Sequence, residues 1–365
     1  MIQSPDDSMI QFFIRIRRLG RGVDLCAFAL LLLALSATEL GAQSGPSVQA
    51  LIRDGQTAIE SGDFSRAATD FEQARQLAPE NLEANRGLLL SYLQGGQLAR
   101  AVQVGRGSVV RWPRDAELRH WLGLAYFKMR QNSLARGELQ QAQALDAGNA
   151  DVHFDLALVD LDESQYAPAA DELEKAIKLK PGYPLAHVLL GRAYQNTNRT
   201  LLGIEQFKIA LRIDPNLPLG HYHLGFAYAS LGRNQEAIAE YQKEIGRNPN
   251  DATVLYQLGH SLLESGDWDS AKKFLDQATQ IDPQNADAFY DLGKALSVGG
   301  DAAGAVAALE RSIQLKPSDP SPHYLLARTL DKMGKRDEAR VEWQRFAELK
   351  KAQPQTGGMA SGRAQ

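Results

Sequence analysis

The sequence has one cysteine in 365 residues, Cys26, which lies near the N-terminus. A single thiol cannot form an intramolecular disulfide, and one cysteine provides no thiolate pair for a zinc site. The formal net charge is −4, so there is no basic excess of the kind that nonspecific binding of nucleic acid requires. The composition therefore excludes a disulfide-stabilised scaffold and argues against a nucleic-acid partner.

Motifs typical of catalysis are also missing. The sequence contains no HExxH, no Cys-x-x-Cys and no glycine-rich phosphate loop, and no segment of it predicts a β-strand. Among the histidines, His221 and His223 are two residues apart and point to different faces of a helix, which disfavours a metal pair. We therefore predict a protein that is not an enzyme and has neither a cofactor nor a metal site.

What the sequence does have is a repeat of 34 residues. In residues 252–285, two segments with the apolar spacing of an amphipathic helix flank the turn residues Ser265, Gly266 and Asp267. Small residues recur at one phase along the chain, at Ala67, Ala101, Ala135, Ala169, Gly203, Ala237, Ala271, Ala305 and Ala339. Prolines recur at another phase, at Pro79, Pro113, Pro181, Pro215, Pro249, Pro283 and Pro317. We expect the small residues to mark places where two helices approach closely.

These series resemble the tetratricopeptide repeat family. The fifth unit carries the motif residues of the family at Leu190, Gly191, Tyr194, Gly203, Phe207, Ala210 and Pro215. The resemblance implies an all-α fold, a right-handed α-solenoid superhelix of about nine 34-residue helix-turn-helix repeats. Proteins of this family are scaffolds, so the resemblance implies a protein partner.

The proposed repeats begin at residues 48, 82, 116, 150, 184, 218, 252, 286 and 320 and end at residue 353. Pro184, Pro218 and Pro320 fit the first turn of a helix, where the missing N–H has no cost. In the second repeat, Gly105 and Gly107 are each expected to weaken a helix by roughly 1 kcal/mol relative to alanine. Residues 43–47 are predicted to be a linker and residues 354–365 a disordered tail.

Residues 1–42 have the pattern of a secretory signal peptide. Basic residues between Arg15 and Arg21 precede an apolar run of 11 residues, Leu25–Leu35, and small residues follow. The alternative is an uncleaved membrane anchor, although spanning a bilayer takes about 20 apolar residues. Translation from either Met1 or Met9 fits the pattern. The sequence predicts an exported protein, periplasmic or extracellular, or one that this segment anchors to a membrane.

The family resemblance places the binding surface on the concave face, which the first helix of each repeat lines. The fifth position of this helix holds tyrosine in the last four repeats, and the ninth position holds mostly cations. The candidate residues are Tyr222, Tyr256, Tyr290, Tyr324, Arg192, Phe226, His260, Lys294 and Arg328. Rings interleaved with cations suit an extended peptide segment or a helix with apolar and acidic side chains. The alternative is that these tyrosines serve packing alone.

The fourth repeat is acidic along its first helix. Asp151, Asp155 and Asp162 lie on it or directly after it, together with Asp160 and Glu163. Because carboxylates on a helix are usually hydrated, the plain interpretation is a solvated face. The functional alternative is an acidic patch that docks a basic segment of a partner.

These observations predict an exported, non-catalytic scaffold that binds another protein through its concave groove. One alternative is a membrane-anchored assembly factor, in which case the membrane is a partner through the N-terminal segment. A second alternative is a repeat module related to the O-GlcNAc-type glycosyltransferases that lacks their catalytic domain. The lysines and asparagines of the family's carboxylate clamp are missing at the required positions, which counts against that class of ligand.

Overall fold

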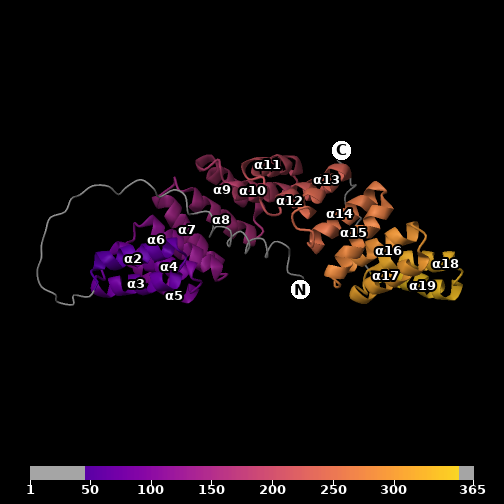
Figure 1. Cartoon of the computed structure of the whole chain (residues 1–365), viewed down its shortest axis with the longest axis horizontal. Helices are drawn as coiled ribbons and strands as arrows, with labels where there is room; N and C mark the ends of the chain where they lie inside the picture. The colour runs from indigo at the N-terminus through magenta and orange to yellow at the C-terminus, as the bar shows by residue number, and fades with distance from the viewer. Residues whose placement is uncertain (1–45, 353–365) are drawn as a thin grey trace, which may run out of the picture. The chain divides into compact units, whose positions relative to one another are not determined.

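The computed structural model describes residues 46–352, and all regular structure in this range is helical (Figure 1). The chain divides into two compact units, Met1–Arg199 and Thr200–Gln365. The described helices of the first unit are α2 (Val48–Glu60), α3 (Phe64–Leu77), α4 (Leu82–Gln94), α5 (Leu98–Arg111), α6 (Ala116–Lys128), α7 (Asn132–Leu145), α8 (Ala150–Asp162), α9 (Tyr166–Leu179) and α10 (Pro184–Asn196). Those of the second unit are α11 (Thr200–Ile213), α12 (Gly220–Ser230), α13 (Asn234–Ile245), α14 (Ala252–Ser265), α15 (Trp268–Ile281), α16 (Ala286–Val298), α17 (Ala302–Leu315), α18 (Pro320–Lys332) and α19 (Arg336–Ala352). The predicted all-α architecture is confirmed.

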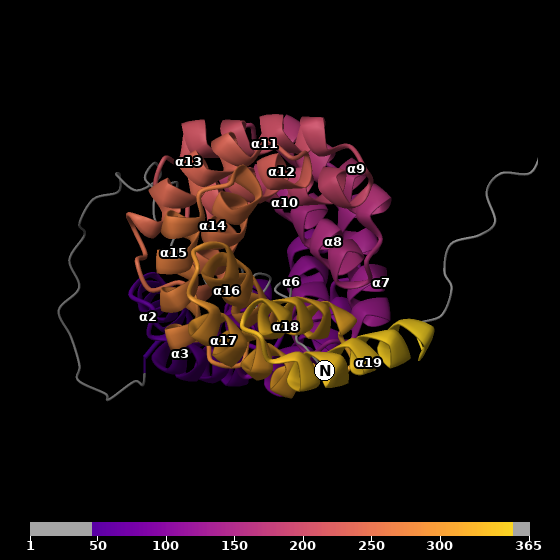
Figure 2. The same ribbon diagram turned by 90° about the vertical axis from the view of Figure 1, so that its right-hand side faces the viewer.

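Consecutive helices form antiparallel hairpins that stack within each unit. In the second unit, α12, α14, α16 and α18 are neighbours along one side, and their hairpin partners lie on the other side (Figure 2). No helix in residues 46–352 combines the length and the apolarity that crossing a bilayer requires. The predicted signal peptide, most of the linker and the predicted tail lie outside the described residues, so those assignments stay predictions.

The first helix of most hairpins starts at an N-cap that the sequence encodes. Asn81 caps α4, Asp115 caps α6 and Asp251 caps α14, each by accepting a hydrogen bond from an N–H of the first turn. Such a cap contributes about 1 kcal/mol to the stability of a helix. Helices begin at residues 48, 82, 116, 150, 184, 252, 286 and 320, which are the predicted repeat starts. A side-chain cap recurs at each of them except α10, where Tyr183 provides none and Pro184 is the first residue of the helix.

The start of α12 departs from this rule. The helix begins at Gly220, so the prediction that Pro218 lies in its first turn is wrong, and Leu219 before the helix has a left-handed φ of 59°. Leu219 provides no side-chain cap, but Glu244 of α13 accepts hydrogen bonds from the backbone N–H groups of Leu219 and Tyr222, both at 3.2 Å. Glu244 is 4% exposed and occupies the register that Ala278 fills one repeat later. A carboxylate from the second helix of the hairpin therefore replaces the local cap.

The small-residue series lies where the two helices of a hairpin meet. The alanines of this series are all 0% exposed, at Ala67, Ala101, Ala135, Ala169, Ala237, Ala271, Ala305 and Ala339. A Cβ atom added at Gly259 would lie 2.6 Å from Cγ of Leu275, and one at Gly293 would lie 2.6 Å from Cγ of Leu309. These distances are shorter than van der Waals contact, so an alanine at either position would require the leucine to shift. The predicted close approach is confirmed at these positions.

Each hairpin turns through one residue with a positive φ, always at the same repeat register. These residues are Gly62, Gly96, Arg130, Ser164, Asn198, Gly232, Gly266, Gly300 and Gly334. A left-handed conformation costs roughly 1–2 kcal/mol for an L-residue with a Cβ atom and nothing of the kind for glycine. The three successive turns without glycine, in the third to fifth repeats, therefore carry this cost, which is smallest at Asn198 because asparagine adopts the left-handed region more readily.

Candidate functional site

The four candidate tyrosines lie at equivalent places on neighbouring helices of the second unit. Tyr222 is on α12, Tyr256 on α14, Tyr290 on α16 and Tyr324 on α18. These helices contact one another in that order, so the structure arranges the tyrosines in succession along one side of the unit. Tyr324 is 39% exposed and the other three are half-buried.

A side chain four residues further along the helix packs against three of these rings. The ring centroids of Tyr222 and Phe226 are 6.3 Å apart, and those of Tyr256 and His260 are 6.1 Å apart. The guanidinium carbon of Arg328 lies 5.6 Å from the ring centroid of Tyr324. This contact follows from helix geometry, since residues four apart lie one above the other on the same face.

Burial raises the pKa of the hydroxyl groups of Tyr256 and Tyr290, and neighbouring carboxylates raise it further. Both hydroxyls therefore stay protonated across the physiological range and can donate hydrogen bonds. Phe226, in contrast, offers only an apolar ring, which is 43% exposed. The surface thus combines apolar area with hydrogen-bond donors.

Two of the candidate cations are paired with carboxylates of the protein itself. Nδ1 of His260 lies 2.8 Å from Oδ2 of Asp291, and Nζ of Lys294 donates to Oε1 of Glu264 at 3.0 Å. The hydrogen bond to Asp291 raises the pKa of His260, against the opposing effect of burial, and Lys294 lowers the pKa of Glu264. Both pairs join α14 to α16, so they connect successive hairpins.

Arg192 differs from the other candidates. It lies on α10 in the first unit and is 9% exposed, so it is not the solvated arginine that the groove prediction requires. Burial of an arginine occurs only where the surrounding structure satisfies its charge. The residue therefore belongs to the interior of the fold in this structure, and its predicted contact with a partner stays a prediction.

The acidic residues of α8 do not form a solvated face. Asp155 is 1% exposed, and its Oδ2 lies 2.6 Å from Nε2 of His120, while Asp160 is 2% exposed and pairs with Arg136. The Asp162 side chain, at 13% exposure, accepts a hydrogen bond from Asn132 at 2.6 Å and pairs with Arg130. Asp151 is half-buried. The expectation of a hydrated face is wrong, because these carboxylates bind cations and polar groups of the preceding hairpin.

A histidine–glutamate pair that the sequence reading missed joins the two helices of several hairpins. Nδ1 of the histidine lies 2.5–2.6 Å from the carboxylate in each case, and the partners are 19 residues apart. The pairs are His153 with Glu172, His221 with Glu240 and His323 with Glu342. The signal was present in the sequence, since the glutamates recur at one phase just as the histidines do.

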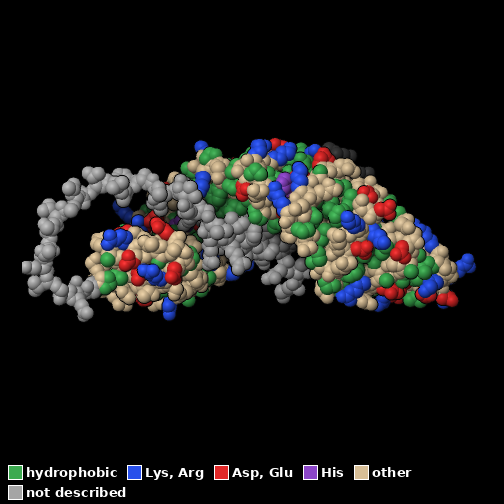
Figure 3. All heavy atoms as spheres, viewed as in Figure 1, with side chains coloured by type: hydrophobic (Ala, Val, Ile, Leu, Met, Phe, Trp, Pro, Cys, Tyr) green, Lys and Arg blue, Asp and Glu red, His purple; other side chains and the backbone are tan. Residues whose placement is uncertain are grey.

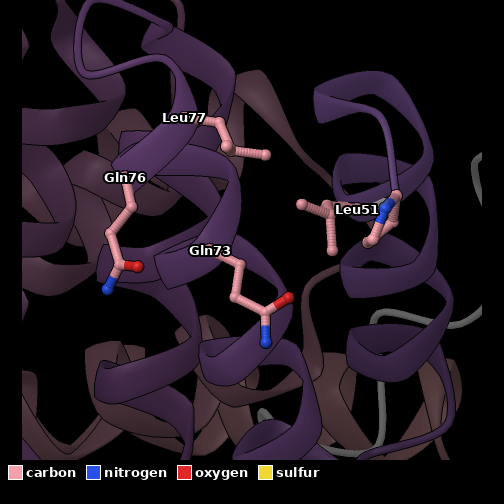
Figure 4. Close-up of a pocket in the computed structure, with 5 residues that line it drawn as sticks. Leu51, Gln73, Gln76 and Leu77 are labelled. Carbon is pink, nitrogen blue, oxygen red and sulfur yellow. The ribbon is translucent and has the colours of Figure 1, made fainter. Parts of the chain in front are cut away.

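The described residues contain no group of three or more His, Cys, Asp or Glu side chains placed to hold a metal ion. A hollow at the first hairpin lies beside α2 and α3, and Figure 4 shows Leu51 facing Gln73 and Leu77 across it. Its lining of Pro46, Leu51, Gln73, Gln76 and Leu77 has no titratable group, so the hollow offers no acid–base chemistry. On the face that Figure 3 shows, charges of both signs are interspersed over the second unit.

Comparisons with known proteins agree on the nature of the repeat. A family model described as tetratricopeptide repeat matches residues 53–116, 122–184, 188–252 and 256–320, and a second model with the same description matches residues 299–356. A search of the curated proteins finds no match.

Several solved structures have a similar fold. The Cut9–Hcn1 hetero-tetramer of the APC/C aligns with a TM-score of 0.52 at 19% identity, over 77% of this chain and 55% of that chain. YrrB, a TPR protein with an unusual peptide-binding site, aligns at 0.46 and 22% identity over 51% of this chain and 96% of its own. A MamA structure aligns at 0.41 and 27% identity over 46% and 92%. The chain thus spans just over half the length of the Cut9–Hcn1 chain, and this likeness shows the fold alone.

Proposed function

Because the chain belongs to the tetratricopeptide repeat family, we propose that it is a non-catalytic protein-interaction scaffold. We propose that it binds a partner on α12, α14, α16 and α18, the first helices of the repeats in its second unit, which we name the inner helices. The residues of this surface, named the aromatic face, are Tyr222, Phe226, Tyr256, His260, Tyr290, Lys294, Tyr324 and Arg328. The occupant is an extended segment or a helix of another protein.

One observation carries the proposal: the aromatic side chains of this face are partly exposed, whereas structural aromatics of the same unit are buried. Phe226 is 43% and Tyr324 39% exposed, compared with 0% for Tyr241 and 0% for Phe207. A ring that served packing alone would be expected to be buried, as Tyr241 and Phe207 are. Partly exposed tyrosines at regular spacing favour the binding role, since aromatic residues contribute strongly to protein interfaces.

Substitution of the rings tests the proposal. The partner is first isolated with the full chain as bait, and its affinity is then measured for Phe226→Ala and Tyr256→Ala. Truncation of an aromatic anchor weakens binding by roughly 1–4 kcal/mol, so we expect clear losses for both variants. The matched control is Ile281→Ala on α15, an apolar residue that is 45% exposed but is not on the aromatic face.

An equal effect of the control and the aromatic variants would contradict the proposal, as would full affinity in both aromatic variants. Circular dichroism melts of each variant are needed beside the binding data, because loss of the fold also lowers affinity. Export is a separate part of the proposal, supported by the sequence pattern of residues 1–42. N-terminal sequencing of the mature protein distinguishes a cleaved signal peptide from a membrane anchor.

A further inference from the structure

The cations at the ninth position of α14 and α16 each pair with a carboxylate of a neighbouring helix, His260 with Asp291 and Lys294 with Glu264. Lys294 is at the ninth position of α16, and Glu264, its partner at 3.0 Å, is at the thirteenth position of the preceding inner helix, α14. One repeat later, the ninth position holds Arg328 and the thirteenth position of α16 holds Val298. The acidic partner that the register provides for Lys294 is thus replaced by an apolar side chain, which is 53% exposed.

Arg328 is therefore a cation without an acidic counterpart from its neighbour helix. It is exposed, its only charge-related contact in residues 46–352 is with the ring of Tyr324, and it forms no ion pair there. Lys332, one helical turn further along α18, is also exposed and likewise forms no ion pair within the described range. The intervening acid, Asp331, accepts a hydrogen bond from Nε1 of Trp343 at 3.0 Å.

The opposite end of the aromatic face has no such charge. In the repeat that contains α12, counted from residue 218, the ninth position holds Phe226 and the thirteenth holds Ser230. In the middle, His260 and Lys294 are compensated by Asp291 and Glu264. Uncompensated positive charge is consequently confined to the end at α18, where two like charges one turn apart repel each other and an anion between them would relieve the repulsion.

We propose that Arg328 and Lys332, beside Val298, bind an Asp or Glu side chain of the partner segment, which therefore lies with its acidic end at α18 and its apolar end at α12. This inference rests on the proposed function and adds the chemistry and the direction of the occupant. The planar guanidinium can hold a carboxylate through two parallel hydrogen bonds, and the lysine adds a second charge. Val298 leaves the site open because it brings no carboxylate of its own.

The comparison of Val298 with Glu264, which is 34 residues earlier, suggests the variant that tests this inference. Val298→Glu places a carboxylate at the position that Glu264 occupies in the preceding repeat, so it should pair with Arg328 and occupy the site from within. Val298→Gln has nearly the same shape and no charge, and it is the matched control. Because Val298 is at the surface, both variants should keep the parental melting temperature to within a few degrees.

The probe is a library of random dodecapeptides displayed on phage through their C-termini, so that no free peptide carboxylate is present. Peptides are selected on the full chain, and binding of the selected peptides is then measured for the variants. We expect enrichment of Asp and Glu toward one end of the peptides and apolar residues toward the other. We expect binding to be roughly fivefold weaker in Val298→Glu, unchanged in Val298→Gln, and weaker at high salt.

The outcomes separate the two proposals. Peptides that need Phe226 and Tyr256 but contain no enriched acid, or that bind Val298→Glu as tightly as Val298→Gln, overturn the acidic site and leave the scaffold function intact. A set of peptides whose binding is insensitive to Phe226→Ala and Tyr256→Ala overturns both. Acid enrichment together with selective loss in Val298→Glu supports the inference.

Discussion

The first and second units both place an aspartate at the sixth position of an inner helix, and both pair it with a histidine of the preceding hairpin. In the first unit, Asp155 is 1% exposed and lies 2.6 Å from His120, whose side chain is 4% exposed. In the second unit, Asp291 is 4% exposed and lies 2.8 Å from His260, whose side chain is 43% exposed. An aspartate at the same register thus belongs to an enclosed pair in one unit and to a pair open to solvent in the other, because its histidine partner is the fifth residue of α6 in the first case and the ninth residue of α14 in the second.

The difference teaches that a charge at a given repeat position has no fixed role. An enclosed charge holds successive hairpins together and must stay paired, because an unpaired buried charge is strongly destabilising. A pair with one exposed member is screened by solvent and contributes little to folding. The interior carboxylates of α8 therefore belong to the fold. The cations of α14 and α16 have carboxylate partners in pairs that are open to solvent, and Arg328 of α18 forms no ion pair in residues 46–352.

The largest expected effect comes from breaking an ion pair whose carboxylate is enclosed. Arg136→Ala removes the guanidinium that pairs with Asp160, a residue that is 2% exposed. The same guanidinium also donates a hydrogen bond to Glu163 at 2.6 Å. We expect a loss of about 3–5 kcal/mol in the free energy of unfolding, because a buried carboxylate is left without a counter-charge. Urea unfolding combined with hydrogen exchange of α7 and α8 measures this loss.

The matching change in the second unit is Lys294→Ala, whose pair with Glu264 is partly exposed on both sides. There the expected loss is below about 1 kcal/mol. Adding Asp160→Asn to Arg136→Ala should recover part of the stability, since the unpaired charge is then gone. Similar losses for Arg136→Ala and Lys294→Ala would show that the two units use their charges alike, contrary to the comparison.

The fold could be predicted from the sequence because its signals are local and repeated. Asn81, Asp115 and Asp251 cap helices within their own turn, and the buried alanine series reports a contact within one hairpin. The start of α12 was missed because its cap, Glu244, comes from the end of the next helix. Six of the nine left-handed turn residues are glycines that recur every 34 residues or a multiple of that. The other three are not glycine, so the sequence gives no comparable signal for them.

The charged residues of α8 were misread for a different reason. Their partners Arg130 and Arg136 lie on the preceding hairpin, 24 or more residues away, so a reading of α8 alone shows only acids. Composition gives the charge of a side chain and not its burial. The candidate tyrosines lie on α12, α14, α16 and α18 of the second unit, as their 34-residue spacing indicates, whereas Arg192 is buried in the first unit.

The next largest change in stability is expected for alanine substitutions at the glycines of α5, a helix that runs unbroken from Leu98 to Arg111. A Cβ atom at Gly107 would meet no atom within 4 Å, so Gly107→Ala should stabilise the first unit by roughly 1 kcal/mol. At Gly105 a Cβ atom would lie 3.0 Å from Cδ1 of Leu122. Gly105→Ala should therefore lack this gain. Thermal melts of the two variants compare them directly, and an equal gain would show that Leu122 moves aside without cost.

A smaller effect is expected at the turns, which differ between the units in their residue type. Ser164 has a φ of 58° in the first unit, whereas Gly266 has a φ of 86° at the same register in the second. Ser164→Gly relieves the left-handed strain but gains freedom in the unfolded chain, so we expect a net stabilisation of up to about 1 kcal/mol. Gly266→Ala should lower stability. A Ser164→Gly variant less stable than the parent would contradict the strain at this turn.

The smallest expected effect is the pH dependence of the pair between His260 and Asp291, which is open to solvent. The hydrogen bond to Asp291 raises the pKa of His260 above its ordinary value of 6.5, and Glu264 adds to this while burial and Lys294 oppose it. Because the folded pKa is the higher one, the pair stabilises the fold fully below pH 6.5, and this contribution is lost as the pH rises through the folded value. NMR titration of the His260 imidazole measures the shift. Asp291→Asn should return the pKa toward 6.5, whereas Lys294→Gln should raise it, because the opposing positive charge is removed. A pKa of His260 at or below 6.5 in the parent protein would contradict the expected effect of the hydrogen bond to Asp291.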